Sequence, residues 1–262
     1  MPRCAVANRF AAIVALVPLM WCGACRAELE DEIQVYTDDI NRPGEFHLEL
    51  HVNTTPDKRN VPDYPGEVTP EHGTRITPEF SYGITSTLEA GLYIPTNIEP
   101  NGNWSIAGAK LRLKWLPVQP ADHGGWFAGE NLEWGDLEQR FSESRQVIEL
   151  RTILGYRNDD WLVAFNPILD VDASPGFAHG DPDFNIGLKV SRKAAEGLLL
   201  GVEYYADFGP VKHFYSWSQQ NHSIWLVMDL DRGPLPFQFG IGRGISPAAD
   251  DWTVKAIFEV PL

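Results

Sequence analysis

The chain alternates between apolar and polar residues over most of its length from residue 45 onward. The segment 45–53 is representative, because EFHLELHVN has apolar side chains at its even positions and polar ones at nearly all odd positions. Successive side chains of an extended strand point to opposite faces, so this period of two predicts β-strands with one apolar face. Twelve strands are predicted, over residues 45–53, 73–82, 87–96, 104–116, 125–135, 146–156, 161–171, 183–192, 198–208, 222–231, 236–244 and 252–262.

The connections between these strands alternate in length. Those after the odd-numbered strands are longer than those after the even-numbered ones, with an overlap at residues 117–124. A meander with short turns at one end and long loops at the other is typical of outer-membrane barrels. An even number of strands then returns both ends of the wall to the short-turn end.

Alternation by itself also fits a soluble β-sandwich, in which the apolar face is buried. Three features favour the inverted arrangement. The strands have the length that a tilted membrane-spanning strand needs, and twelve strands enclose a lumen too wide for an apolar core. Six tryptophans also fall at strand ends, where an interfacial girdle belongs: Trp104, Trp115, Trp126, Trp134, Trp161 and Trp252. We predict an all-β protein, a closed antiparallel up-and-down transmembrane β-barrel of about 12 strands, with the soluble β-domain as the alternative.

The first residues have the layout of a secretory signal peptide. Arg3 and Arg9 precede the apolar run 11–20, and small residues at 23–27 suit cleavage after Ala27. We therefore predict three parts: a cleaved signal peptide at 1–27, an acidic periplasmic segment at 28–44, and the barrel at 45–262. A lipoprotein with Cys25 acylated is the weaker alternative.

Charge and cysteine content narrow the partners. The 36 acidic residues outnumber the 21 basic ones, which argues against nucleic acid, because phosphate binding needs clustered lysine and arginine. All cysteines lie in the predicted signal peptide, at Cys4, Cys22 and Cys25. The exported chain therefore has no thiol for a disulfide or a catalytic nucleophile.

Several segments carry a resemblance to a known family: EIQVYTDDINRPGEFHLELHVN, DYPGEVTPEHGTRITPEFSYGI, LRLKWLPVQP, DRGPLPFQFGIGRG and the ending DWTVKAIFEVPL. They are similar to proteobacterial outer-membrane barrels grouped with porin-like proteins that are named after a meta-cleavage pathway of phenol degradation. The resemblance implies location in the Gram-negative cell outer membrane, contact with its lipid, and recognition of the C-terminal strand by the barrel-assembly machinery. Such barrels usually finish on an aromatic residue, whereas this sequence finishes on Leu262.

The polar faces of the predicted strands carry balanced charge. We expect these side chains to line the lumen: Glu49, Glu79, Glu89, Glu149, Glu203, Asp207 and Glu259 with Arg75, Lys110, Arg112, Lys114, Arg151, Lys189 and Lys255. One interpretation is a network of cross-strand ion pairs that stiffens the wall. The other is a solute pathway, for which equal numbers of both signs predict no ion preference.

His47, Glu49 and His51 share one face of the first strand and are the weak candidates for a metal site. Residues four apart on a strand are about 13 Å apart, too far for one ion to bridge both imidazoles. A neighbouring strand would have to supply a further ligand. We therefore expect neither a metal nor another cofactor.

Three functions remain open at this point. A narrow porin-like barrel that transports small solutes is favoured, the alternative is a structural or assembly barrel without an open pore, and an outer-membrane hydrolase is third. His222 and Ser223 are the adjacent histidine and serine, but neighbours on a strand point to opposite faces. We therefore predict that the protein is not an enzyme.

Overall fold

The computed structural model describes residues 31–57, 62, 64–69, 71–175, 180–233 and 235–260. Within these ranges the chain is all-β, and no helix is long and apolar enough to cross a membrane. The strands are β1 (Phe46–Asp57), β2 (Thr74–Thr85), β3 (Leu88–Tyr93), β4 (Thr96–Ile98), β5 (Trp104–Ile106), β6 (Gly108–Val118), β7 (Gly124–Leu137), β8 (Gln146–Asn158), β9 (Trp161–Asp172), β10 (Asp183–Ala195), β11 (Leu198–Pro210), β12 (Asn221–Leu230), β13 (Phe237–Gly244) and β14 (Trp252–Val260).

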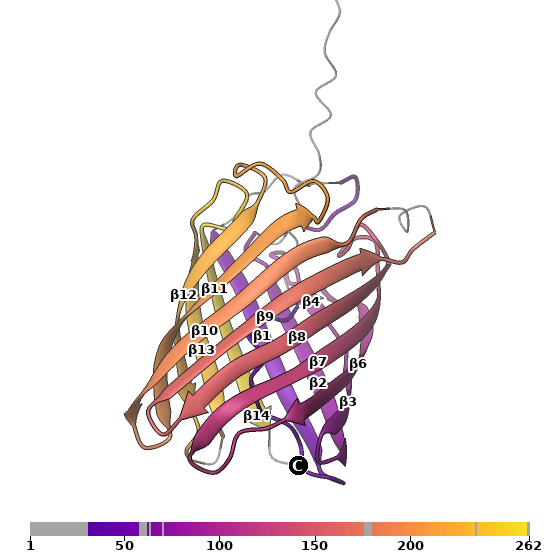
Figure 1. Cartoon of the computed structure of the whole chain (residues 1–262). Coiled ribbons are helices and arrows are strands. Elements are labelled where there is room, and N and C mark those ends of the chain that lie inside the picture. The colour runs from indigo at the N-terminus through magenta and orange to yellow at the C-terminus, as the bar shows by residue number, and fades with distance from the viewer. Residues whose placement is uncertain are drawn as a thin grey trace, which may run out of the picture.

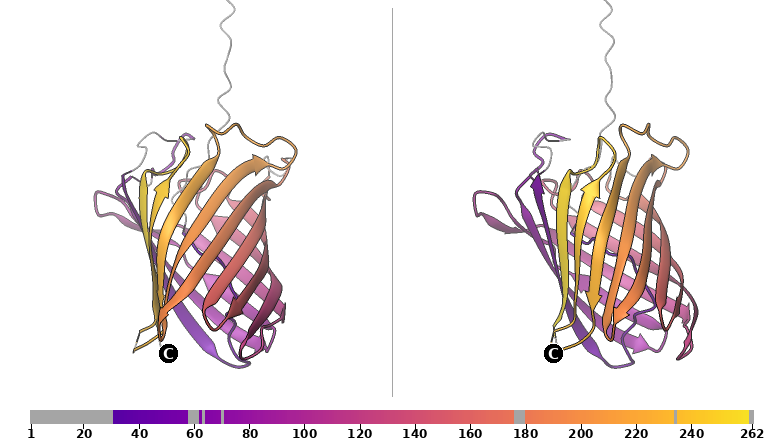
Figure 2. Two further views of the ribbon diagram at one scale, coloured as in Figure 1. Left: turned by 60° about the vertical axis from the view of Figure 1, so that its left-hand side comes forward. Right: turned by 90° about the vertical axis from the view of Figure 1, so that its left-hand side faces the viewer.

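The wall closes on itself. Each wall strand pairs antiparallel with its neighbours in sequence, and β1 pairs with both β2 and β14, so that Leu48 lies opposite Phe80 on one side and Val260 on the other. Twelve strands form this ring, which Figure 1 shows from the side. The strands β4 and β5 lie outside it. The predicted closed up-and-down barrel is confirmed. The strands tilt around the barrel axis, and β14 lies beside β1 in both views of Figure 2.

The predicted strands match the observed ones to within a few residues except at 87–96 and 104–116. The end of the first and the start of the second instead form a small hairpin, in which Thr96 of β4 lies opposite Ile106 of β5. Pro95 has no N–H to donate to a ladder, although its carbonyl accepts a bond from Ala107. The wall therefore breaks at this point and resumes as β6.

The apolar faces of the wall strands point outward. On β6, Leu111 is 54% exposed whereas the next residue, Arg112, is 6% exposed. Large apolar side chains along β7, β8, β9 and β12 are exposed in the same way. Because a soluble β-domain buries its apolar face, this arrangement is the inverted one that the sequence predicts.

Short and long connections separate to opposite ends of the barrel. The connections 86–87, 119–123, 159–160, 196–197 and 231–236 lie at the end that also holds the C-terminal strand end, marked C in Figure 1. We call this the short-turn end and the opposite one the long-loop end. With the observed strand bounds, every wall connection at the short-turn end is shorter than every one at the long-loop end.

Most of the described residues before β1 lie inside the barrel. Residues 31–41, which we call the inner segment, descend from Asp31 beside Lys110 of β6 to Asp38 beside Arg157 at the end of β8. The sequence predicts that residues 28–44 form a separate periplasmic segment. Residues 31–41 lie in the lumen, where their backbone and side chains bond to charged groups of the inner wall, and residues 42–44 are exposed.

Candidate functional site: the charged lumen and its inner segment

Ion pairs connect the inner faces of β2, β3 and β6. The Nη2 atom of Arg112 lies 2.7 Å from Oε1 of Glu79 and 2.5 Å from Oε1 of Glu89, and Lys114 lies 3.5 Å from Glu89. The register places Glu89 directly opposite Lys114, so the contacts follow from strand pairing. All four side chains are buried, and the opposite charges offset part of the desolvation cost of burying each of them.

A second network crosses β10, β11, β12 and β14. Lys255 Nζ lies 2.5 Å from Glu203 Oε2, and Lys189 Nζ lies 3.3 Å from Glu203 and 2.8 Å from Asp229. Lys255 and Glu203 are almost completely buried. This buried ion pair is therefore part of the wall structure, and its side chains are not freely hydrated in the lumen.

All twelve of the sequence-predicted candidates lie on the inner side. They border one of two lumen cavities or are buried between the wall and the inner segment: Glu49, Glu79, Glu89, Lys110, Arg112, Lys114, Glu149, Arg151, Lys189, Glu203, Lys255 and Glu259. Arg75 is buried and Asp207 borders the cavity at the long-loop end.

Charged wall residues hold the backbone of the inner segment. Lys255 donates to the carbonyl of Ile33 at 2.9 Å, and Arg151 donates to the carbonyl of Gln34 at 2.9 Å. Asn166 of β9 accepts from the N–H of Tyr36 at 2.6 Å and donates to its carbonyl at 3.1 Å. Because an unpaired buried backbone group is costly, these wall residues are what allows an irregular segment to sit in the lumen.

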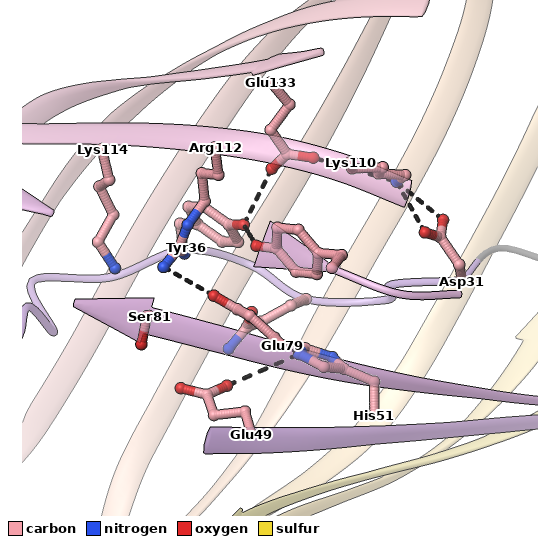
Figure 3. A network of polar contacts seen from close by, with 12 residues as sticks. Asp31, Tyr36, Glu49, His51, Glu79, Ser81, Lys110, Arg112, Lys114 and Glu133 are labelled. Carbon is pink, nitrogen blue, oxygen red and sulfur yellow. Dashed lines mark hydrogen bonds and ion pairs between the residues drawn. The ribbon is translucent and has the colours of Figure 1, made fainter. Parts of the chain in front are cut away.

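The Tyr36 side chain lies at the centre of the network (Figure 3). Its hydroxyl lies 2.7 Å from the hydroxyl of Tyr93 and donates to Glu133 at 3.2 Å. Arg112 and Arg151 lie 5.7 Å and 4.5 Å from the centre of its ring, within the range of cation–π attraction. The phenol ring thus links the inner segment to several wall strands.

An apolar patch on the inner wall receives the same segment. Val35 and Tyr36 pack on buried residues of β6, β7, β8 and β9: Leu116, Phe127, Ile153, Leu162 and Ala164. Ile33 packs on Trp225 and Val227 of β12. These wall residues are apolar at positions where the alternation predicts polar, inward-facing side chains. Apolar residues at such positions are the signal in the sequence for an apolar contact inside the lumen.

The inner segment borders two cavities of the lumen. The cavity toward the long-loop end has a volume of about 240 Å³ and is bordered by Asp31, Lys110 and Asp207, among others. The cavity toward the short-turn end is larger, about 570 Å³, and is bordered by Glu49, Lys114 and Glu259, among others. Gln34 of the inner segment borders both.

The three weak metal candidates separate into two groups. His47 lies 3.9 Å from Glu259 of β14. Glu49 and His51 instead meet Glu79 of β2, and ligand atoms of these three residues lie within 4.8 Å of one another. Glu79 lies directly opposite Glu49 in the strand register, which is why the neighbouring strand supplies it.

The side chains of His222 and Ser223, the histidine–serine pair considered for hydrolysis, do not lie together. Ser223 faces the long-loop-end cavity and accepts a hydrogen bond from the indole N–H of Trp225. His222 packs instead against Tyr204, Phe208 and Trp217. The two side chains therefore lie in different environments and do not meet.

Comparisons with known proteins agree with this geometry. No protein-family model and no curated protein matches the chain. Among solved structures, an outer membrane channel from Pseudomonas putida F1 matches with a TM-score of 0.58 and 10% identity over 87% of this chain and 99% of that chain. The NanC porin matches with a TM-score of 0.52 and 10% identity over 82% and 100%, and the KdgM porin with 0.50 and 8% over 82% and 99%. This chain has the fold of an outer-membrane channel barrel. At these identities the likeness concerns the fold.

Proposed function

We propose that the protein is a narrow channel for small polar solutes in the bacterial outer membrane, with the inner segment forming its constriction. The observation that carries this proposal is the pair of polar cavities that approach the inner segment from the two ends of the lumen. A lumen lined by charged groups of both signs can replace part of the hydration shell of a polar solute. Any path between the two cavities passes between the side chains of the inner segment and the wall that faces them.

The location belongs to the same proposal. The layout of residues 1–27 supports export by a signal peptide, and the outward apolar side chains support insertion in lipid. The C-terminal strand β14, which closes the ring against β1, would be read by the barrel-assembly machinery. We also propose that the chain belongs with the phenol meta-pathway group of porin-like proteins, on the sequence segments that resemble it.

A structural barrel without an open pore is the second candidate. The observation that favours it is the number of bonds between the inner segment and the wall. These bonds link the wall strands to Asp31, Ile33, Gln34, Tyr36 and Asp38. If these bonds persist at all times, the two cavities stay separate. We propose no catalytic activity in either case.

Conductance separates the two candidates. The refolded protein should form channels in planar bilayers, and Tyr36→Ala should raise the single-channel conductance because it removes the phenol that bridges the inner segment to Tyr93 and Glu133. Tyr82→Ala is the matched control, since Tyr82 is exposed on the outer surface. A folded protein without conductance, in both the natural chain and the Tyr36 variant, would favour the structural barrel.

A further inference from the structure

One group of buried side chains on the inner wall brings two carboxylates to a single imidazole. Glu49 and His51 of β1 face Glu79 of β2, and Figure 3 shows both carboxylates directed toward the imidazole. His51 Nε2 lies 3.1 Å from Glu79 Oε2 and 3.7 Å from Glu49 Oε2. The ligands of a tetrahedral zinc ion are about 3.4 Å apart when the bonds are about 2.1 Å long. These two distances are close to that spacing, and ligand atoms of all three residues lie within 4.8 Å of one another.

The remaining contacts of these residues leave the ligand atoms available. Arg112 binds Oε1 of Glu79, so Oε2 stays on the side of His51. His51 is completely buried, and its Nδ1 atom has no hydrogen-bond partner among the described residues. Nε2 of His51 hydrogen-bonds Oε2 of Glu79. A metal ion would take the place of the shared proton, and Nδ1 would carry the proton of the neutral imidazole.

A third carboxylate group in this region also has an oxygen that lacks a partner in the described part of the chain. Glu32 of the inner segment is 9% exposed, and its Oε1 atom has no hydrogen-bond partner among the described residues. It interacts electrostatically with both His51 and Glu79. An unpaired buried carboxylate oxygen is costly, and a cation between His51, Glu49 and Glu79 would lower that cost.

We propose that Glu49, His51 and Glu79 bind a divalent transition-metal ion, with Glu32 or a water molecule as the fourth ligand. Glu49 and Glu79 border the 570 Å³ cavity, which gives the ion a route from the short-turn end. One imidazole with carboxylates suits zinc, cobalt or manganese, whereas calcium and magnesium prefer oxygen ligands throughout. The proposal is independent of whether the barrel conducts solutes.

Cobalt titration of the chain from residue 28 onward, refolded in detergent, tests the site, because this chain lacks Cys4, Cys22 and Cys25. Co²⁺ should bind at one ion per chain and give the visible absorption of low-coordinate cobalt, and Zn²⁺ should displace it. His51→Gln and Glu79→Gln should each weaken binding by roughly tenfold or more, because each removes a ligand. The heat-dependent gel shift of the barrel shows that each variant is folded.

His47→Gln is the matched control, because His47 is on the same strand but pairs with Glu259. It should bind Co²⁺ with the affinity of the natural chain. The proposal is overturned if the folded natural chain binds neither ion, if His51→Gln binds as tightly as the natural chain, or if His47→Gln loses binding to the same extent. A misfolded Glu79→Gln variant leaves His51→Gln as the deciding comparison.

Discussion

At the scale of single residues, Glu130 interrupts the apolar outer face. Its neighbours on β7, Asn131 and Phe127, are buried in the lumen, whereas Glu130 lies on the outside opposite Thr152. The Thr152 hydroxyl donates to its carboxylate at 3.0 Å. A carboxylate on a lipid-facing surface is unfavourable, and this single hydrogen bond offsets part of the cost.

We expect Glu130→Leu to raise the free energy of unfolding by about 1 kcal/mol, since acids cost less than bases on the lipid face. The opposite change on the same face, Leu132→Glu, should lower it by about 1–2 kcal/mol. Urea titrations of the protein folded in lipid vesicles measure both values. If both variants lose stability equally, Glu130 makes a stabilising contact in addition to its hydrogen bond with Thr152.

Arg112 provides a second prediction at this scale. It is buried between Glu79 and Glu89, and removing one partner of a buried ion pair leaves the other charges uncompensated. Arg112→Leu should therefore lower the free energy of unfolding by about 3–5 kcal/mol. Arg145→Leu is the control, because Arg145 is exposed and pairs with Asp136; it should cost about 1 kcal/mol or less. Similar small losses in both variants would show that the lumen is well hydrated around Arg112.

At the scale of elements, the inner segment is held by wall contacts of two kinds. Hydrogen bonds from Lys255, Arg151 and Asn166 satisfy its backbone. The apolar patch around Phe127 receives Val35 and Tyr36. Because the wall hydrogen bonds do not depend on this segment, the segment can leave its position without opening the ring.

Val35→Asp tests this independence. A carboxylate in the apolar patch is strongly unfavourable, so the segment should be displaced, and single-channel conductance should rise while the heat-dependent gel shift of the barrel stays unchanged. Asn101→Asp is the control, because Asn101 is exposed in the turn between β4 and β5 and the variant adds the same charge away from the lumen. Loss of the gel shift in Val35→Asp would show that the segment is required for the barrel itself.

At the scale of the whole molecule, the long-loop and short-turn ends define its orientation in the membrane. Short turns of outer-membrane barrels face the periplasm. A tag inserted at Gly102, in the exposed turn between β4 and β5, should therefore be labelled on intact cells. A tag between Asp159 and Asp160, in the β8–β9 turn, should be labelled after the outer membrane is broken. The reverse result would invert the proposed orientation.

The strands, the ring and the two faces of the wall followed from the sequence by itself. A period of two is a local property of an extended chain, so Leu111 and Arg112 were assigned to opposite faces before any contact was known. The charged inner residues could be named for the same reason. The break at Pro95 was not predicted, because the predicted strand continues through residue 96, and the hairpin of β4 and β5 was not predicted either.

Tertiary structure decided what fills the lumen. Residues 31–41 have no regular alternation, and their position depends on bonds to Lys255, Arg151 and Asn166, which are far away in sequence. Glu79 joins Glu49 and His51 through the β1–β2 register, which local periodicity does not specify. Such contacts join residues that lie far apart in sequence, so the closed barrel is needed to bring them together.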